Sequence, residues 1–303
     1  MKIIIIGYGV AGKRYFRALK KKNIDLLIVS KSKKKIFYKK KNISIIYQDI
    51  KNILFEDVKA VIIASPLETH WFYLKIFLRK NVDIIIEKPV INNLSHFNKL
   101  KKLIKNFRNN FYINHSDLYN KNFLTLIKKK KFTSIKKINF YYGNNKNKYN
   151  IKENKRPISD WLPHVLAITV FFLKKINNYK ILYFYREIKN NLIYEKILIQ
   201  LYSGIIVSNF YFSNFPDTNQ RNFLIELENG YLNFDAYNNK NYSSFSGKKS
   251  FLNVISKNTF DNLIDVLLFN INRQKSNNDF YLFEKYFMIQ LKINSHLLRL
   301  KNT

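Results

Sequence analysis

The first 115 residues alternate short apolar runs with longer amphipathic segments. Segments at 13–22, 69–80 and 94–107 have apolar residues at helical spacing, whereas the runs between them are continuously apolar, as strands covered on both faces are. We expect these strands at 2–6, 26–29, 43–47, 59–65, 82–86 and 111–114. The pattern predicts an α/β domain with a doubly wound parallel sheet.

From about residue 134 the pattern changes to an alternation of apolar and polar positions. Such alternation is typical of antiparallel strands whose two faces differ. We expect these strands at 134–142, 180–188, 193–202, 204–212 and 222–227, and closing helices at about 258–271 and 280–299. The sequence thus predicts two domains, residues 1–117 and 118–303.

Composition removes several function classes. The chain has 303 residues, 47% of them hydrophobic, and no cysteine, which excludes disulfides, thiolate zinc sites and a cysteine nucleophile. Its five histidines leave little scope for a histidine-rich metal site, so no metal is expected. No run reaches the roughly 18 apolar residues of a membrane span. Gly7, Gly9 and Lys13 interrupt the apolar start, which argues against a signal peptide and favours a cytoplasmic protein.

The formal net charge of +34 raises the question of a nucleic-acid or membrane partner. However, the lysines are spread over the whole chain, and Asn, Ile, Phe and Tyr are abundant together with them. Codons rich in A and T encode all of these residues, so genome composition accounts for the charge. We therefore consider nucleic acid an unlikely partner, and polyanion binding remains the alternative.

Three of the seven glycines form the segment Gly7-Tyr8-Gly9-Val10-Ala11-Gly12 between the first strand and an amphipathic helix. In this context the first glycine makes the tight turn, the second lets the backbone approach a pyrophosphate, and the third lets helix and strand pack closely. The helix start then offers N–H groups to the phosphates. The segment predicts a dinucleotide site that includes Val10 and Ala11.

The end of the second strand distinguishes NAD from NADP. NAD enzymes usually have a carboxylate there for the ribose 2′-hydroxyl, whereas this chain has Ser30 and Lys31. Serine and lysine suit a 2′-phosphate, so NADP(H) is favoured. NAD(H), with the lysine merely solvated, stays possible.

Four motifs in order resemble the Gfo/Idh/MocA oxidoreductase family: the glycine turn, Ser65-Pro66 with His70 four residues later, Glu87-Lys88-Pro89, and Asp160 with His164 four residues on. The resemblance covers nearly the whole chain. It implies a C-terminal α/β domain with a large open antiparallel sheet, whose face receives substrate and often serves for dimer contacts. A homodimer or homotetramer through that sheet is therefore expected.

The resemblance also implies site residues. Ser65, Pro66, Glu87 and Lys88 would line the cofactor, and His70 would be structural or would line the ribose. Lys88 follows a buried parallel strand at its carboxyl end, where ligands bind in such folds. An ammonium group there can hydrogen-bond the reacting oxygen and stabilise alkoxide charge. Lys88 is thus expected to be catalytic.

Asp160 and His164 are spaced i,i+4 on a predicted helix and so share one face. A carboxylate one turn away can orient an imidazole and raise its pKa, which makes His164 a candidate proton donor and acceptor. The alternative is a capping Asp160 and a core His164, with Pro163 in the first helical turn. The family commonly has a further Asp where this chain has Ala167, which leaves the substrate class open.

Weaker substrate candidates are Tyr119, Asn120 and Arg156. The first two follow the sixth strand and equally suit a plain helix start; Lys155 and Arg156 precede the helix of Asp160 and equally suit solvated charges. His96, His115 and His296 show no partner pattern.

Taken together, the sequence predicts an NAD(P)-dependent dehydrogenase or reductase. We expect it to interconvert a secondary alcohol and a ketone on a sugar, nucleotide-sugar or sugar-like substrate. The alternatives are an imine or enoyl-type reductase acting on a non-sugar metabolite, and a non-catalytic nucleotide-binding or polyanion-binding protein.

Overall fold

The computed structural model describes residues 1–22, 24–30, 43–46, 50, 55, 57–128, 134–144, 149–150, 156–236, 241–245, 247–251, 259–273 and 277–300. The chain divides into two compact units, each described by itself. The first contains Met1–Ser116 and Lys257–Tyr281, and the second contains Asp117–Ser256 and Leu282–Thr303. The sequence pattern placed every residue after 117 in the second domain.

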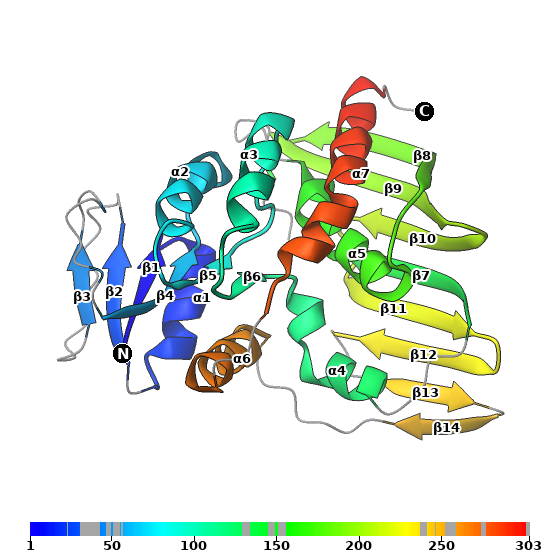
Figure 1. Cartoon of the computed structure of the whole chain (residues 1–303). Helices are drawn as coiled ribbons and strands as arrows, with labels where there is room; N and C mark the ends of the chain where they lie inside the picture. The colour runs from blue at the N-terminus through cyan, green and yellow to red at the C-terminus, as the bar shows by residue number, and fades with distance from the viewer. Residues whose placement is uncertain are drawn as a thin grey trace. The chain divides into compact units, whose positions relative to one another are not determined.

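The first unit is built on a parallel sheet in the order β3-β2-β1-β4-β5-β6 (Figure 1). Apolar side chains on successive positions bury both faces of the central strands, as the sequence predicts for a doubly wound sheet. The strands are β1 (Lys2–Ile6), β2 (Asp25–Val29), β3 (Ile43–Ile46), β4 (Val58–Ile63), β5 (Asp83–Ile86) and β6 (Phe111–Ile113). The helices between them are α1 (Val10–Leu19), α2 (Leu67–Phe77) and α3 (Leu94–Ile104). The fold class is therefore confirmed for this half of the chain.

A late segment of the chain completes the first unit. Helix α6 (Thr259–Arg273) packs beside α1, where the rings of Tyr15 and Phe260 meet edge to face (Figure 1). Residues 277–279 then run along β6, exchanging hydrogen bonds of 2.8–2.9 Å with the backbone of Phe111. The edge strand of the parallel sheet is thereby paired.

The second unit carries an eight-stranded sheet in the order β14-β13-β12-β11-β7-β10-β9-β8. Its strands are β7 (Ile135–Gly143), β8 (Asn178–Lys189), β9 (Leu192–Ser203), β10 (Ile206–Ser213), β11 (Gln220–Leu227), β12 (Gly230–Asp235), β13 (Tyr242–Phe245) and β14 (Lys248–Phe251). Most neighbours are antiparallel, as predicted, but β7 and β10 pair in parallel. Alternation shows that a strand has two unlike faces and does not reveal which strand lies beside it, so this pairing was not predictable.

Helices cover one face of this sheet. They are α4 (Lys121–Lys128), which follows a short 3-10 turn at Ser116–Tyr119, and α5 (Pro157–Leu173). The last helix of the chain is α7 (Phe280–Arg299). The covered face is aromatic: Phe123 of α4 meets Phe223 and Phe234 edge to face. Within the described residues, no helix is long and apolar enough to cross a membrane.

Candidate active site

The glycine turn connects β1 to α1 and is constrained by its neighbours. Gly7 has a φ of +90°, and a Cβ there would lie 2.6 Å from the carbonyl oxygen of Ala64. A Cβ at Gly12 would collide with the carbonyl oxygen of Gly7. Because both positions lack room for a side chain, the turn and the start of α1 can pack against the carboxyl ends of β1 and β4 only with glycine.

Gly9 differs from the other two glycines, because a Cβ there would have no atom within 4 Å. It precedes α1, whose first turn has no side-chain cap and no acidic residue. Val10 and Ala11 follow it, and Val10 is 72% exposed. An open space in front of uncapped N–H groups fits a dinucleotide pyrophosphate, which needs close approach to backbone and the positive end of a helix dipole.

The segment after β2 is described only in part. Ser30 follows Val29 directly and is buried. Lys31 lies outside the described residues, so its predicted contact with a 2′-phosphate is not placed.

The turn after β4 is linked to the loop after β5 through one side chain. His70 on α2 is 1% exposed. Its Nε2 lies 2.9 Å from the carbonyl oxygen of Ser65, and its Nδ1 lies 3.1 Å from the carbonyl oxygens of Pro89 and Val90. Backbone carbonyl oxygens of the protein thus face both ring nitrogens, which favours the structural interpretation of His70 over contact with a ribose. Pro66 is the N-cap of α2, and the hydroxyl of Thr69 donates to the Ser65 hydroxyl at 2.7 Å.

The loop Glu87-Lys88-Pro89 follows β5 and contains a cis Lys88–Pro89 peptide bond. The Glu87 carboxylate accepts a hydrogen bond of 2.9 Å from the Tyr15 hydroxyl and one of 2.6 Å from the Asn114 amide. Glu87 is therefore an anchor between α1, β5 and the end of β6. Lys88 is half-buried between this anchor and the carbonyl groups facing His70.

His115 lies near Lys88, although the sequence assigned it no role. It follows β6 directly and is 1% exposed. Complete burial, with a smaller contribution from the positive charge of Lys88, lowers the pKa of His115 to about 3. A neutral imidazole is therefore adjacent to the proposed catalytic ammonium. Its place after β6, where a parallel sheet binds ligands, was the available sequence signal.

In the second unit, an ionic cluster fixes the start of α5. Glu195 of β9 is fully buried, and its Oε1 accepts hydrogen bonds from Arg156 at 2.7 Å and from Arg186 at 3.0 Å. Its Oε2 receives the backbone N–H of Ile158 at 3.3 Å, in the first turn of α5. Both guanidinium groups lie over the ring of Phe184. Arg156 is therefore a structural member of this cluster rather than a solvated charge.

Glu195 was not recognised in the sequence, although a signal existed. It occupies a covered-face position of β9, in line with Ile193, Ile197 and Ile199. A single carboxylate among the apolar residues of one strand face indicates a buried partner of opposite charge.

Asp160 and His164 both lie on α5, one turn apart. The Tyr149 hydroxyl donates to Asp160 Oδ2 at 2.8 Å, and burial together with the Asp160 charge raises the pKa of Tyr149. His164 is 6% exposed. Pro163 was predicted in the first helical turn, but α5 begins at Pro157 and Pro163 lies inside the helix. The fully buried Ala167 lies one turn beyond Pro163.

The weaker candidates after β6 have a local explanation. The Asn120 side chain accepts the backbone N–H groups of Asn122 and Phe123, at 2.9 and 3.4 Å, at the start of α4. Tyr119 is buried at the end of the preceding 3-10 turn. This geometry favours the plain helix start over contact with a substrate.

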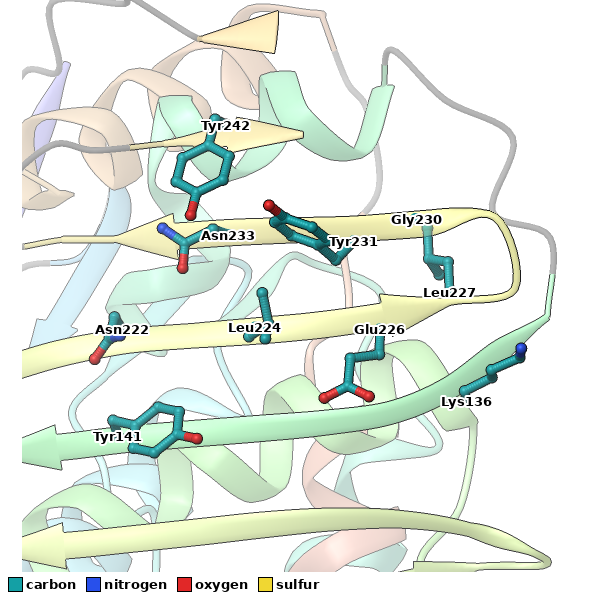
Figure 2. Close-up of a pocket in the computed structure, with 10 residues that line it drawn as sticks. All are labelled: Lys136, Tyr141, Asn222, Leu224, Glu226, Leu227, Gly230, Tyr231, Asn233 and Tyr242. Atoms are coloured by element: carbon teal, nitrogen blue, oxygen red, sulfur yellow. The ribbon is translucent and has the colours of Figure 1, made fainter. Parts of the chain in front are cut away.

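A pocket of about 640 Å³ lies on the face of the second sheet away from α4 and α5 (Figure 2). Its residues Tyr141, Asn222 and Asn233 alternate with Phe140, Phe223 and Phe234 of the covered face. No predicted site residue lines it. Among the described residues, no cluster of three or more His, Asp or Glu could hold a metal ion.

Comparisons with known proteins agree with this geometry. Residues 1–115 match the family model GFO_IDH_MocA, described as an oxidoreductase family with an NAD-binding Rossmann fold. Among curated proteins, no sequence matches significantly.

Solved structures share the fold of the entire chain. UDP-N-acetylglucosamine 3-dehydrogenase from Acidithiobacillus ferrooxidans has a TM-score of 0.79 at 14% identity, with 99% of each chain covered. A Gfo/Idh/MocA family oxidoreductase from Vibrio cholerae has a TM-score of 0.74 at 14% identity, covering 99% of this chain and 100% of that one. Biliverdin reductase from Synechocystis sp. PCC 6803, in complex with biliverdin and NADP+, has a TM-score of 0.71 at 12% identity, with 98% of each chain covered. The Rossmann domain of this chain, residues 1–115, thus matches the Gfo/Idh/MocA oxidoreductase family model, and the chain shares its fold with a solved oxidoreductase of that family.

Proposed function

We propose that this oxidoreductase interconverts a secondary alcohol and a ketone on a sugar, nucleotide-sugar or sugar-like substrate, using NADP(H). The observation that carries the proposal is the setting of Lys88. It lies at the carboxyl end of a parallel strand, between the Glu87 anchor and the carbonyl groups that face His70. A rigid cation at this edge of the sheet is suited to hold the oxygen of the reacting carbon.

When bound, the nicotinamide cofactor accepts or gives the hydride. The protein's residues handle the oxygen and its proton. In the oxidation direction, Lys88 stabilises the developing charge on the substrate oxygen, and His164 takes the hydroxyl proton. In reduction, His164 returns the proton to that oxygen. Asp160, held by Tyr149 at 2.8 Å, orients His164 from one helical turn away.

NADP(H) is favoured over NAD(H) because Ser30, and not a carboxylate, follows β2. An acidic side chain there would repel a 2′-phosphate, whereas a hydroxyl can hydrogen-bond it. The glycine turn supports either nucleotide, since it would bind the pyrophosphate that both share.

An imine or enoyl-type reduction is the second candidate. The apolar, buried Ala167 supports it, because the family commonly has an acid at this position. The fold shared with biliverdin reductase is compatible with such a substrate.

We further propose that the chain forms a homodimer or homotetramer through the uncovered face of the second sheet. Tyr141 and Tyr211 stack there with ring centroids 5.0 Å apart. Beside them, Asn209 donates to Asn139 at 2.7 Å, and Asn139 donates to Glu226 at 2.8 Å. A broad surface of rings and satisfied amides suits a partner of the same kind. Light scattering on the wild type and on Tyr211→Glu tests this; a monomeric wild type would contradict it.

The reaction is tested in two steps. NADPH and NADH are first titrated against Trp71 and Trp161 fluorescence, with NADPH expected to bind about tenfold more tightly, a difference of about 1.4 kcal/mol. A panel of ketoses, nucleotide sugars, imines and enones is then reduced with the nucleotide that binds. Turnover of a ketone supports the proposal, whereas turnover of only an imine or enone supports the second candidate. Failure of both nucleotides to bind would overturn it.

A further inference from the structure

The buried His70 side chain lies between the Ser65–Pro66 turn, which lines the cofactor in the proposed function, and the loop that carries Lys88. His70 projects from α2, with its Nε2 facing the carbonyl oxygen of Ser65 and its Nδ1 facing those of Pro89 and Val90. Ser65 begins the turn after β4, and Pro89 follows Lys88 after β5. The three distances are 2.9–3.1 Å, within hydrogen-bonding range.

We propose that His70 is a positioning residue that holds the Ser65–Pro66 turn and the Lys88–Pro89 loop at a fixed spacing. It thereby sets Lys88 relative to the bound nucleotide. The inference rests on the proposed function, in which the Ser65 turn lines the cofactor and Lys88 holds the reacting oxygen. His70 itself touches neither cofactor nor substrate.

The segments after β4 and β5 are connected by more than one contact. Their strands are paired through Ile63 and Ile86, and Glu87 still donates its N–H to the Ile63 carbonyl at 2.9 Å. His70 adds a second connection, because its ring nitrogens face Ser65 on one side and Pro89 and Val90 on the other. The other flank of Lys88 is fixed independently, because Glu87 is anchored by Tyr15 and Asn114. Substitution of His70 should therefore loosen the backbone after Lys88, at Pro89 and Val90, and leave the backbone before it, at Glu87, in place.

The chemistry of the ring makes the two contacts unequal. Burial lowers the pKa of His70, so the ring is neutral near pH 7 and carries one N–H. It can then donate at only one nitrogen, and a hydrogen bond to the Lys88 loop requires that this nitrogen is Nδ1, which faces Pro89 and Val90. Amide side chains can reproduce each half separately, since an Asn amide nitrogen lies near the place of Nδ1 and a Gln amide nitrogen near that of Nε2.

The test compares His70→Asn, His70→Gln and His70→Phe with the wild type. Leu78→Ala, which removes buried apolar atoms at the C-terminal end of α2, is the control for general destabilisation. The first readout is the NADPH dissociation constant from fluorescence. The second needs no cofactor: limited acetylation with acetic anhydride, with Lys88 modification measured by peptide mass spectrometry relative to exposed Lys59 in the same chain.

We expect His70→Phe to increase the Lys88-to-Lys59 acetylation ratio about threefold or more and to weaken NADPH binding about tenfold. His70→Asn, whose amide nitrogen can donate to the Pro89 and Val90 carbonyls, should restore both values to within about threefold of the wild type, whereas His70→Gln should not. Leu78→Ala should lower the melting temperature without changing either value.

Two results would overturn the positioning role. One is a folded His70→Phe protein with wild-type acetylation of Lys88. The other is the absence of rescue by His70→Asn, which would show that a hydrogen bond from the Nδ1 position to the Lys88 loop does not set the position of Lys88. If the wild type binds no nucleotide, the proposed function fails, whereas the acetylation ratio still decides the role of His70.

Discussion

The loops of the parallel sheet and the start of α5 are held by different kinds of contact. Around Lys88, neutral or singly charged side chains bond to backbone carbonyls and to one carboxylate, as His70 and Tyr15 do. Around the start of α5, two guanidinium groups share the buried carboxylate of Glu195. In the first region several hydrogen bonds of moderate strength share the stabilisation, whereas in the second it depends on one buried carboxylate. Changes in the first region should therefore affect binding more than stability, and changes in the second should do the reverse.

The largest effect is expected from Glu195→Ala. It leaves Arg156 and Arg186 without their shared counter-charge and removes the acceptor for the Ile158 N–H. Breaking a buried pair by removing one partner costs about 3–5 kcal/mol, and urea denaturation should show a loss of that size. Glu228→Ala, at an exposed carboxylate directly after β11, is the control. A loss below about 1 kcal/mol would mean that the cluster does not hold α5.

His164→Asn tests the proposed acid–base role directly. If His164 carries the substrate proton, turnover should fall about 10²-fold while NADPH affinity and the melting temperature stay near wild type. Steady-state kinetics on the best substrate of the panel measures this. A decrease of less than about threefold, with cofactor binding intact, would remove the acid–base role from this residue.

The burial of His115, in the first region, predicts that the free energy of unfolding depends on pH. Its pKa is about 3 in the folded protein and 6.5 in the unfolded chain, so between these values the unfolded chain binds more protons. This contribution to stability is complete above pH 6.5 and is lost as the pH falls, by about 1.4 kcal/mol per pH unit. Denaturation of the wild type and of His115→Leu between pH 6 and pH 4 should show a shallower slope in the variant. Equal slopes would contradict a neutral, buried His115.

Gly9→Ala should have the smallest effect on stability and a specific effect on binding. The added methyl group meets no protein atom within 4 Å, so the melting temperature should stay within the error of the wild type. NADPH affinity should nevertheless fall about tenfold, since the methyl group enters the proposed path of the pyrophosphate. Gly12→Ala is the contrast, because its Cβ would collide with the Gly7 carbonyl and should impair folding as well as binding. Unchanged affinity in Gly9→Ala would place the phosphates elsewhere.

The features that could be predicted are those encoded over short stretches of the chain. The strands from β1 to β6, the helices between them and the glycine turn follow from periodicity and from glycines at fixed offsets, and the structure contains them. The spacing of Asp160 and His164 placed both on one helix, as found in α5. These relations extend over fewer than ten residues, and backbone geometry alone links them.

Only the tertiary structure decided which distant segments meet. The pairing of residues 277–279 with β6, the parallel alignment of β7 with β10, and the contact of α6 with α1 depend on how whole elements pack. The same holds for the roles of Glu195, Tyr149 and His70, whose partners lie 11–39 positions away or on another element. A strand's periodicity specifies which face is apolar, but its neighbour is selected by the summed burial of all elements, which no local pattern contains.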